Sequence, residues 1–205
     1  MPLSHKLVDE PGHLLYLWYI TEATSQLQSI FNNVYKDLVP VEQFGSEIRQ
    51  REWLSVRLLV AEILGHPTRI NYLRKGCPFL PDESFNISIS HAKNWVGVQL
   101  LADKPAGLDM EIKSDKIRRI APKFMNNIEI MNSDDSLDYL YKVWCSKEVL
   151  FKVHQNGNVD FKRDLTISLG ASSIEGEIKN LESSGRYSLS SVDLKELIII
   201  YHSPQ

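Results

Sequence analysis

The feature that most constrains the fold is a pattern that occurs twice along the chain. Residues 51–65 (REWLSVRLLVAEILG) and 141–153 (YKVWCSKEVLFKV) each place a Trp near the start of a segment with helical apolar periodicity. Short alternating segments typical of antiparallel strands follow each of them. This repeated order predicts an α+β fold of two similar halves related by a pseudo-twofold, each an antiparallel sheet packed on a long helix. Pro105-Ala106-Gly107 marks the predicted boundary, with halves at residues 1–105 and 106–205.

Further elements follow from the same periodicities. The segments with strand patterns are residues 14–20, 85–90, 95–101 and 108–112, and then four runs between residues 164 and 202. The segments 85–90 and 95–101 flank HAKN, which predicts a hairpin. A helix is predicted within residues 22–39. Another is predicted over residues 114–131, with Ile117, Ile120, Phe124 and Ile128 on one face and Pro122 as a kink or an end.

Composition restricts the class of protein. The chain has 205 residues, 43% of them apolar and 24% charged, which is enough for an ordinary globular core. A net charge of −3 argues against nucleic acid as the main partner. The two cysteines, Cys77 and Cys145, form no disulfide framework and no zinc motif. The apolar run at residues 14–20 is too short to span a membrane, so we expect a cytoplasmic protein with no membrane contact.

The segment LDMEI places two carboxylates on one side of a strand. Asp109 and Glu111 are two residues apart, so their Cα atoms should lie about 6.5–7 Å from each other on the same face. Two such carboxylates repel unless a cation lies between them, and oxygen-only ligands suit a hard ion such as Mg²⁺. The alternative is that both simply line the solvent face of a half-exposed strand.

The helix VWCSKEVLFK carries an acid between two bases. One interpretation is a solvated face on which Glu148 pairs with Lys152 at i, i+4 spacing. The other is that Glu148 is a third carboxylate facing Asp109 and Glu111, with Lys147 and Lys152 beside a metal and its phosphate. Positioning and compensation of spread negative charge are what phosphoryl transfer requires.

The turn ISHAKN places Ser90 and His91 at the end of a strand. A hydroxyl and an imidazole there can donate hydrogen bonds to phosphate oxygens, or they can be a turn cap and a surface histidine. A Ser-His nucleophilic pair is disfavoured, because neighbouring strand residues point to opposite faces and no G-x-S-x-G elbow is present. No G-x-x-x-x-G-K-[ST] loop is present either, which excludes an ordinary P-loop ATPase.

Three segments, FNISISHA, GLDMEI and VWCSKEVLFK, occur in this order and resemble the 4'-phosphopantetheinyl transferases. The similarity is to the larger, surfactin-synthetase-activating class, which has two fused halves in one chain. The resemblance implies transfer of 4'-phosphopantetheine from coenzyme A to a serine of an acyl or peptidyl carrier protein, with release of 3',5'-ADP.

The resemblance also implies roles for individual residues. Asp109, Glu111 and Glu148 would bind Mg²⁺ or Mn²⁺. Ser90 and His91 would hold coenzyme A phosphates, and Lys152 would contact the pyrophosphate. Arg51 would grip the nucleotide end of coenzyme A. In catalysis Lys152 and His91 would stabilise the developing charge, and Glu148 would accept the serine proton, directly or through water. The N-terminal half would then be the nucleotide side and the C-terminal half the metal-binding, catalytic side.

Two departures from the family pattern stand out. The family commonly has Gly-Lys-Pro before the strand that leads to Ser-His, and its lysine reaches the 3'-phosphate. Here the chain reads RKGCPFL, with Cys77 at that place, so Lys75 or Arg74 would have to substitute. The run FNISISHA is also two residues longer than usual.

The expected partner is a carrier protein, which is usually an acidic helical bundle. Arg118, Arg119 and Lys123 offer a basic surface for it, or they form an ordinary solvated helix face. With two halves in one chain, we expect a monomer. Two other functions use the same residues: a Mg²⁺-dependent hydrolase of nucleotide pyrophosphates, and a non-catalytic protein that binds coenzyme A or carriers.

Overall fold

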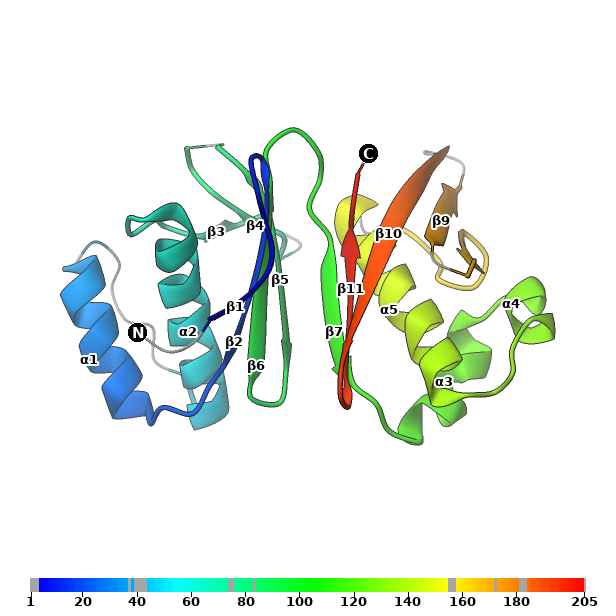
Figure 1. The fold of residues 1–205 in the computed structure, drawn as a ribbon, viewed down its shortest axis with the longest axis horizontal. Coiled ribbons are helices and arrows are strands. Elements are labelled where there is room, and N and C mark those ends of the chain that lie inside the picture. The colour runs from blue at the N-terminus through cyan, green and yellow to red at the C-terminus, as the bar shows by residue number, and fades with distance from the viewer. Residues whose placement is uncertain are drawn as a thin grey trace. The chain divides into compact units, whose positions relative to one another are not determined.

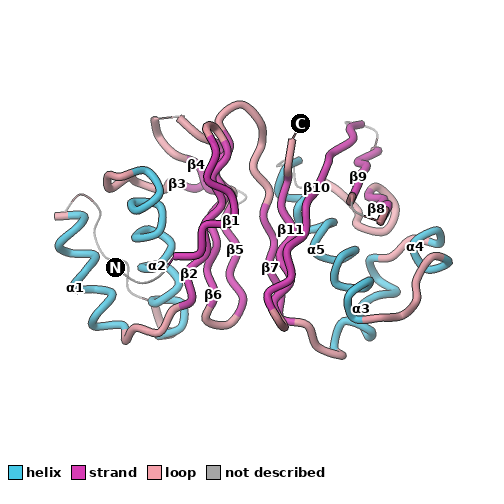
Figure 2. The backbone as a smooth tube through the Cα atoms, in the orientation of Figure 1, coloured by secondary structure: helices cyan, strands magenta, loops and turns pink. Residues whose placement is uncertain are grey.

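The computed structural model describes residues 4–36, 38, 44–73, 76–82, 84–154, 158–171, 173–180 and 184–204. The chain divides into two compact units, Met1–Lys104 and Pro105–Gln205. Each unit contains an antiparallel sheet packed against helices, so the predicted α+β class is confirmed (Figures 1 and 2).

The N-terminal unit holds a four-stranded sheet in the order β1-β2-β6-β5 and a small two-stranded sheet β3-β4. Its elements are β1 (Ser4–Glu10), β2 (His13–Tyr19), α1 (Thr24–Tyr35), α2 (Glu47–Leu64), β3 (Asn71–Tyr72), β4 (Pro78–Phe79), β5 (Asn86–Ala92) and β6 (Trp95–Leu101). Apolar residues along α2 pack on β2 and β6 and form the core of this unit. The helix ends at Gly65, whose φ of 75° suits glycine.

One strand of this unit has no apolar alternation in its sequence. β1 pairs antiparallel with β2 across Pro11-Gly12, where Gly12 has φ +81°. The segment SHKLVDE is polar and lies at the sheet edge, so periodicity alone did not predict it. The predicted hairpin β5–β6 is confirmed, with Ile89 opposite Val98.

The C-terminal unit holds a five-stranded sheet in the order β7-β11-β10-β9-β8. Its elements are β7 (Leu108–Ile112), α3 (Lys116–Phe124), α4 (Asn127–Met131), α5 (Leu137–His154), β8 (Leu165–Leu169), β9 (Ile174–Lys179), β10 (Ser184–Leu194) and β11 (Leu197–His202). The long helix α5 packs chiefly on β11 and β7, as the ribbon of this unit shows (Figure 1).

The prediction of one helix over residues 114–131 is wrong. The structure has two helices, because Met125 is extended and Asn126 starts a new helix with a capping box to Glu129. Pro122 lies inside α3. Ile128 is 62% exposed, so it does not continue the buried face that Ile117 and Phe124 form.

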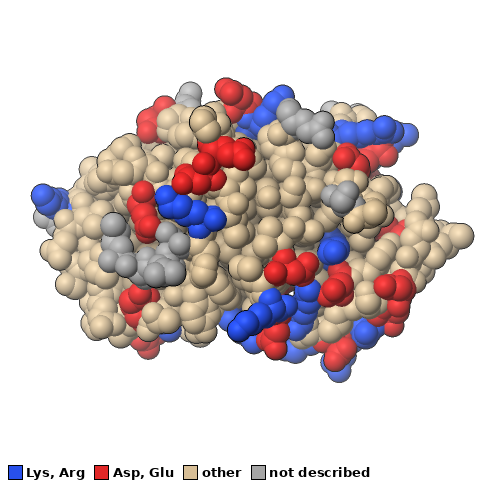
Figure 3. All heavy atoms as spheres, in the orientation of Figure 1, with Lys and Arg blue, Asp and Glu red and all other residues tan. Residues whose placement is uncertain are grey.

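Charges of both signs are interspersed on the face drawn in Figure 3 rather than gathered by sign. Among the residues that the structure describes, no helix is both long and apolar enough to cross a membrane.

Candidate active site

Strand β7 presents Asp109 and Glu111 to helix α5, as the strand period predicts. The carboxylate of Asp109 lies 2.8 Å from Nζ of Lys152, and the indole Nε1 of Trp144 donates to Oε1 of Glu111 at 3.4 Å. Leu108 and Met110 alternate with these two residues along the strand, so they point to the opposite face of the sheet, and both are buried. The two carboxylates therefore share the face of the sheet on which α5 packs.

Helix α5 supplies the other side of this cluster. Trp144, Glu148 and Lys152 are spaced at i, i+4, so they follow one another along the same helical face. Besides its contact with Asp109, the Lys152 ammonium donates to the backbone oxygen of Leu108 at 2.6 Å. The predicted residues of the C-terminal half are thus brought together by β7 and α5.

Several pKa values in this cluster are raised, because its side chains are buried and its negative charges lie close together. Burial and the nearby carboxylate of Asp109 raise the pKa of Glu148 to about 7, although Lys152 opposes this shift. Burial and then Asp109 also raise the pKa of Glu111. The pKa of the Cys145 thiol lies well above its ordinary value, because the side chain is buried and both β7 carboxylates are close. The carboxylates of Asp109, Glu111 and Glu148 thus share the single ammonium of Lys152.

The crowding of carboxylates in this cluster is the observation that tests whether a divalent cation fits the site. The donors are carboxylate oxygens, the ligand type that Mg²⁺ and Mn²⁺ prefer. As they stand, the described side chains include no group of three or more His, Cys, Asp or Glu residues arranged to hold a metal ion. Lys152 occupies Oδ1 of Asp109, and Trp144 contacts Glu111. The donor chemistry fits a hard cation, which would compete with the Lys152 ammonium for the carboxylate of Asp109.

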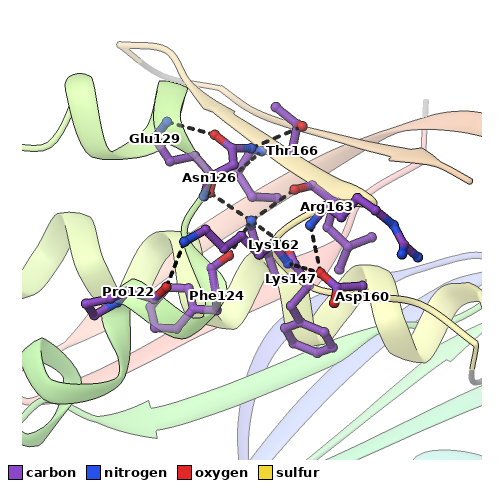
Figure 4. A network of polar contacts seen from close by, with 12 residues as sticks. Pro122, Phe124, Asn126, Glu129, Lys147, Asp160, Lys162, Arg163 and Thr166 are labelled. Carbon is purple, nitrogen blue, oxygen red and sulfur yellow. Dashed lines mark hydrogen bonds and ion pairs between the residues drawn. The ribbon is translucent and has the colours of Figure 1, made fainter.

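Lys147 does not face this cluster, contrary to the interpretation that set it beside a metal and phosphate. Its side chain is fully buried, and Nζ lies 2.8 Å from Oε2 of Glu129, which is also fully buried. It also donates to the backbone oxygens of Phe124, Phe161 and Leu165, as Figure 4 shows in part. Burial lowers the pKa of Lys147, and the hydrogen bond to Glu129 opposes this.

The partner of Lys147 is itself held by backbone groups. Oε2 of Glu129 accepts from the backbone N–H of Asn126 at 2.8 Å, and Oε1 accepts from that of Ile167 at 2.9 Å. The Asn126 side chain accepts from the N–H of Glu129 and donates to Thr166. The capping box of α4 is therefore part of one buried polar network with Lys147 (Figure 4).

In the N-terminal unit, Ser90 and His91 point to opposite faces of β5. Ser90 is buried, whereas the His91 side chain is 40% exposed. His91 shares its face with Ile89, since residues two apart point the same way. The two residues predicted to hold phosphate do not lie on one face.

His91 belongs to a polar cluster with two residues of α2. Nη1 of Arg49 lies 3.1 Å from Nε2 of His91 and 2.9 Å from Oε2 of Glu52. These residues line a cavity of about 160 Å³. Its full lining is Phe44, Arg49, Glu52, Trp53, Val56, Arg57, Tyr72, Ile89 and His91. The buried guanidinium of Arg57 stacks 3.7 Å above the Trp53 ring, so the cavity combines cations with aromatic walls.

The other predicted residues of this unit lie elsewhere. Arg51 donates to the backbone oxygen of Ile20 at 3.3 Å and does not line the cavity, whereas Arg49 does. Lys75 and Arg74 fall outside the described residues. Sequence reasoning missed Arg49, Glu52 and Arg57. The i, i+3 spacing of Arg49 and Glu52 was visible in the sequence, but nothing local indicated His91 as their neighbour.

Comparison with known proteins gives two findings. No protein-family profile matches the chain. The chain is 30% identical over 136 residues to a protein of Haemophilus influenzae that carries the provisional name of a 4'-phosphopantetheinyl transferase. The similarity covers 57% of this chain and 57% of the relative, so the chain spans little more than half the length of the curated protein that it matches.

Proposed function

We propose that this protein transfers 4'-phosphopantetheine from coenzyme A to a serine of an acyl or peptidyl carrier protein. The observation that carries the proposal is the convergence of Asp109, Glu111, Glu148 and Lys152 from β7 and α5. The distant similarity to a protein named for this activity supports the same reaction. We further propose the larger, two-half class of the family, since each unit has its own sheet and long helix.

Metal binding is the first part of the proposed chemistry. Asp109, Glu111 and Glu148 would hold Mg²⁺ or Mn²⁺. Such an ion supplies a positive charge that neutralises the pyrophosphate and its transition state. The excess of carboxylates over cations in the cluster supports this assignment.

The residues of the chain perform the remaining steps. The carrier serine oxygen forms a bond to the β-phosphorus of coenzyme A while the bond from that phosphorus to the bridging oxygen breaks. The leaving group is 3',5'-ADP. Lys152 would donate hydrogen bonds to pyrophosphate oxygens after it leaves Asp109. Glu148 is the proposed acceptor of the serine proton, directly or through water.

We propose that the N-terminal unit contributes to coenzyme A binding. His91 and Arg49 are hydrogen-bond donors of the kind that phosphate groups require, and Trp53 supplies an aromatic wall. Ser90 and Arg51 remain predicted contacts from the resemblance.

A surface on α3 and α4 is the proposed docking site for the carrier. Arg119 and Lys123 are exposed, and Arg118 is exposed but paired with Asp115 and Asp135. Beside them in the chain lie apolar side chains that are 36–84% exposed, namely Ile120, Ile128, Ile130 and Met131. An acidic helical carrier complements the basic charges, and its own apolar side chains can cover the exposed ones.

Intact-mass spectrometry tests the proposed function. Apo carrier proteins are incubated with this protein, coenzyme A and Mg²⁺, with and without EDTA. We expect a gain of one phosphopantetheine on a carrier serine that EDTA abolishes. Coenzyme A breakdown without carrier modification would instead establish the pyrophosphate hydrolase. Intact coenzyme A and unmodified carriers across the whole panel would favour the binding protein.

A further inference from the structure

We infer that Lys147 is a positioning residue whose buried ammonium sets the rotation of α5 about its own axis. The rotation decides where Glu148 and Lys152 point. The catalytic consequence rests on the proposed function, whereas the structural consequence does not.

The contacts of Lys147 come from four separate segments of the unit. Its Nζ lies 2.7 Å from the oxygen of Phe124 at the end of α3, and 2.9 Å from that of Leu165 at the start of β8. It lies 2.8 Å both from the oxygen of Phe161 and from Oε2 of Glu129 in α4. An ammonium has three hydrogens, so four acceptors from different directions leave it little freedom to move.

Helix geometry passes this restraint to the face of α5 that carries Trp144, Glu148 and Lys152. At about 100° per residue, Glu148 projects about 100° around the axis from Lys147. Trp144 projects at about 60° and Lys152 at about 140°, so the three occupy an arc of about 80°. That arc faces β7, where Lys152 meets Asp109. Any rotation of α5 would move all three side chains together.

Apolar packing alone fixes such a rotation less well. Cores tolerate exchange and small shifts of apolar side chains when volume is kept. A buried ion pair is often no more stabilising than an apolar replacement, and its best-attested use is to specify one arrangement over others. Lys147 lies on the side of α5 away from Asp109, so it acts through the helix rather than by contact with a substrate.

The double variant Lys147→Met/Glu129→Gln tests the inference, because it removes both charges and leaves no lone buried ion. The first readout needs neither metal nor coenzyme A. The chain has four Trp residues, so the indole ¹H–¹⁵N signal of Trp144 can be assigned by its loss in Trp144→Phe. Leu189→Ala is the matched control: it removes a buried side chain from β10 and leaves every Lys147 contact in place.

We expect the Trp144 signal to shift or broaden in the double variant and to stay in place in the control. The second readout is transfer kinetics far below the melting temperature of each variant. We expect kcat to fall by about tenfold or more with KM for coenzyme A changed less, since small misplacements of positioned groups cost that much. A purely stabilising role would leave kcat unchanged under these conditions.

Several outcomes overturn the inference. The double variant could keep the wild-type Trp144 signal and kcat, or Leu189→Ala could change both equally. If the double variant does not fold, Lys147→Arg carries the test, because it keeps a cation beside Glu129 but changes the length and geometry of the donor. A smaller shift and a loss of about threefold in kcat are then expected, and wild-type values in Lys147→Arg would contradict us. If the wild-type protein transfers nothing, the proposed function fails, while an unchanged Trp144 signal in the double variant would still refute the positioning role.

Discussion

The ammonium of Lys147 lies 2.8 Å from a carboxylate oxygen of Glu129, and neither side chain is exposed to solvent. The next residue, Glu148, belongs instead to a cluster in which the charges are not balanced, because carboxylates outnumber cations. Two adjacent charged residues of one helix therefore have different tasks. One satisfies a buried network, and the other faces the proposed chemistry.

The buried pair predicts a large and asymmetric effect on stability. Lys147→Met leaves the Glu129 carboxylate buried without its cation, so we expect a loss of about 3–5 kcal/mol in the free energy of unfolding. Adding Glu129→Gln should recover at least about 1 kcal/mol, because no lone charge then remains. Urea unfolding at neutral pH measures both. A double variant less stable than Lys147→Met would contradict the prediction.

Glu148→Gln should abolish most transfer activity. The variant loses a metal ligand and the proposed proton acceptor together, so we expect a fall in kcat of more than tenfold, or about 1.4 kcal/mol in the barrier. Steady-state kinetics with a carrier protein and coenzyme A give the value. Glu196→Gln, in the exposed turn before β11, is the control and should keep full activity.

The raised pKa of Glu148 predicts the pH dependence of stability in the metal-free protein. A carboxyl with a pKa of about 7, against an ordinary 4.5, binds more protons in the folded than in the unfolded state between these values. Glu148 therefore makes its full contribution to the free energy of unfolding below about pH 4.5, and this contribution is lost as the pH rises through 7. With partial exposure considered, we expect a change on the order of 1–2 kcal/mol.

Urea unfolding in EDTA at about pH 5 and pH 7.5 checks this dependence. Glu148→Gln should gain stability relative to the wild type as the pH rises. Mg²⁺ at the higher pH should stabilise the wild type more than the variant. A difference between the two proteins that does not vary with pH would exclude the expected coupling.

Gly107→Ala should disturb the contact between α5 and the start of β7. A Cβ there would lie 2.6 Å from Cγ2 of Val153 and 2.9 Å from Cγ1 of Val149, so side chains and helix must shift. We expect a loss of about 1–3 kcal/mol in the free energy of unfolding and slower transfer. Gly45→Ala meets nothing within 4 Å and should be nearly neutral. Equal effects of the two substitutions in urea unfolding would refute the steric account.

Charge reversal on α3 should weaken carrier binding. For the double variant Arg119→Glu/Lys123→Glu we expect KM for the carrier to rise by about three- to tenfold at low salt, with KM for coenzyme A unchanged. High salt should reduce the difference. Lys179→Glu, an exposed reversal on β9, serves as the control. An unchanged carrier KM in the α3 variant would remove this surface from consideration.

Local periodicity accounts for much of what could be predicted here. The helix α5, the hairpin β5–β6 and the strand β7 were all predicted from the spacing of apolar residues, and the structure contains them. The shared face of Asp109 and Glu111 follows from the strand period, and that of Trp144, Glu148 and Lys152 from the helical one. The strand β1 was not predicted, because its residues are polar and only its pairing with β2 makes it a strand.

By itself, the sequence determined which side chains share a face of one element, because backbone geometry alone sets those directions. Only the tertiary structure decided which faces meet. Glu129 and Leu165 lie 18 residues away from Lys147 on either side in the chain, and Arg49 is 42 residues from His91. On an isolated helix, Lys147 would be a solvent-facing charge. In the folded unit it is buried, because packing brings it hydrogen-bond acceptors that its own helix lacks.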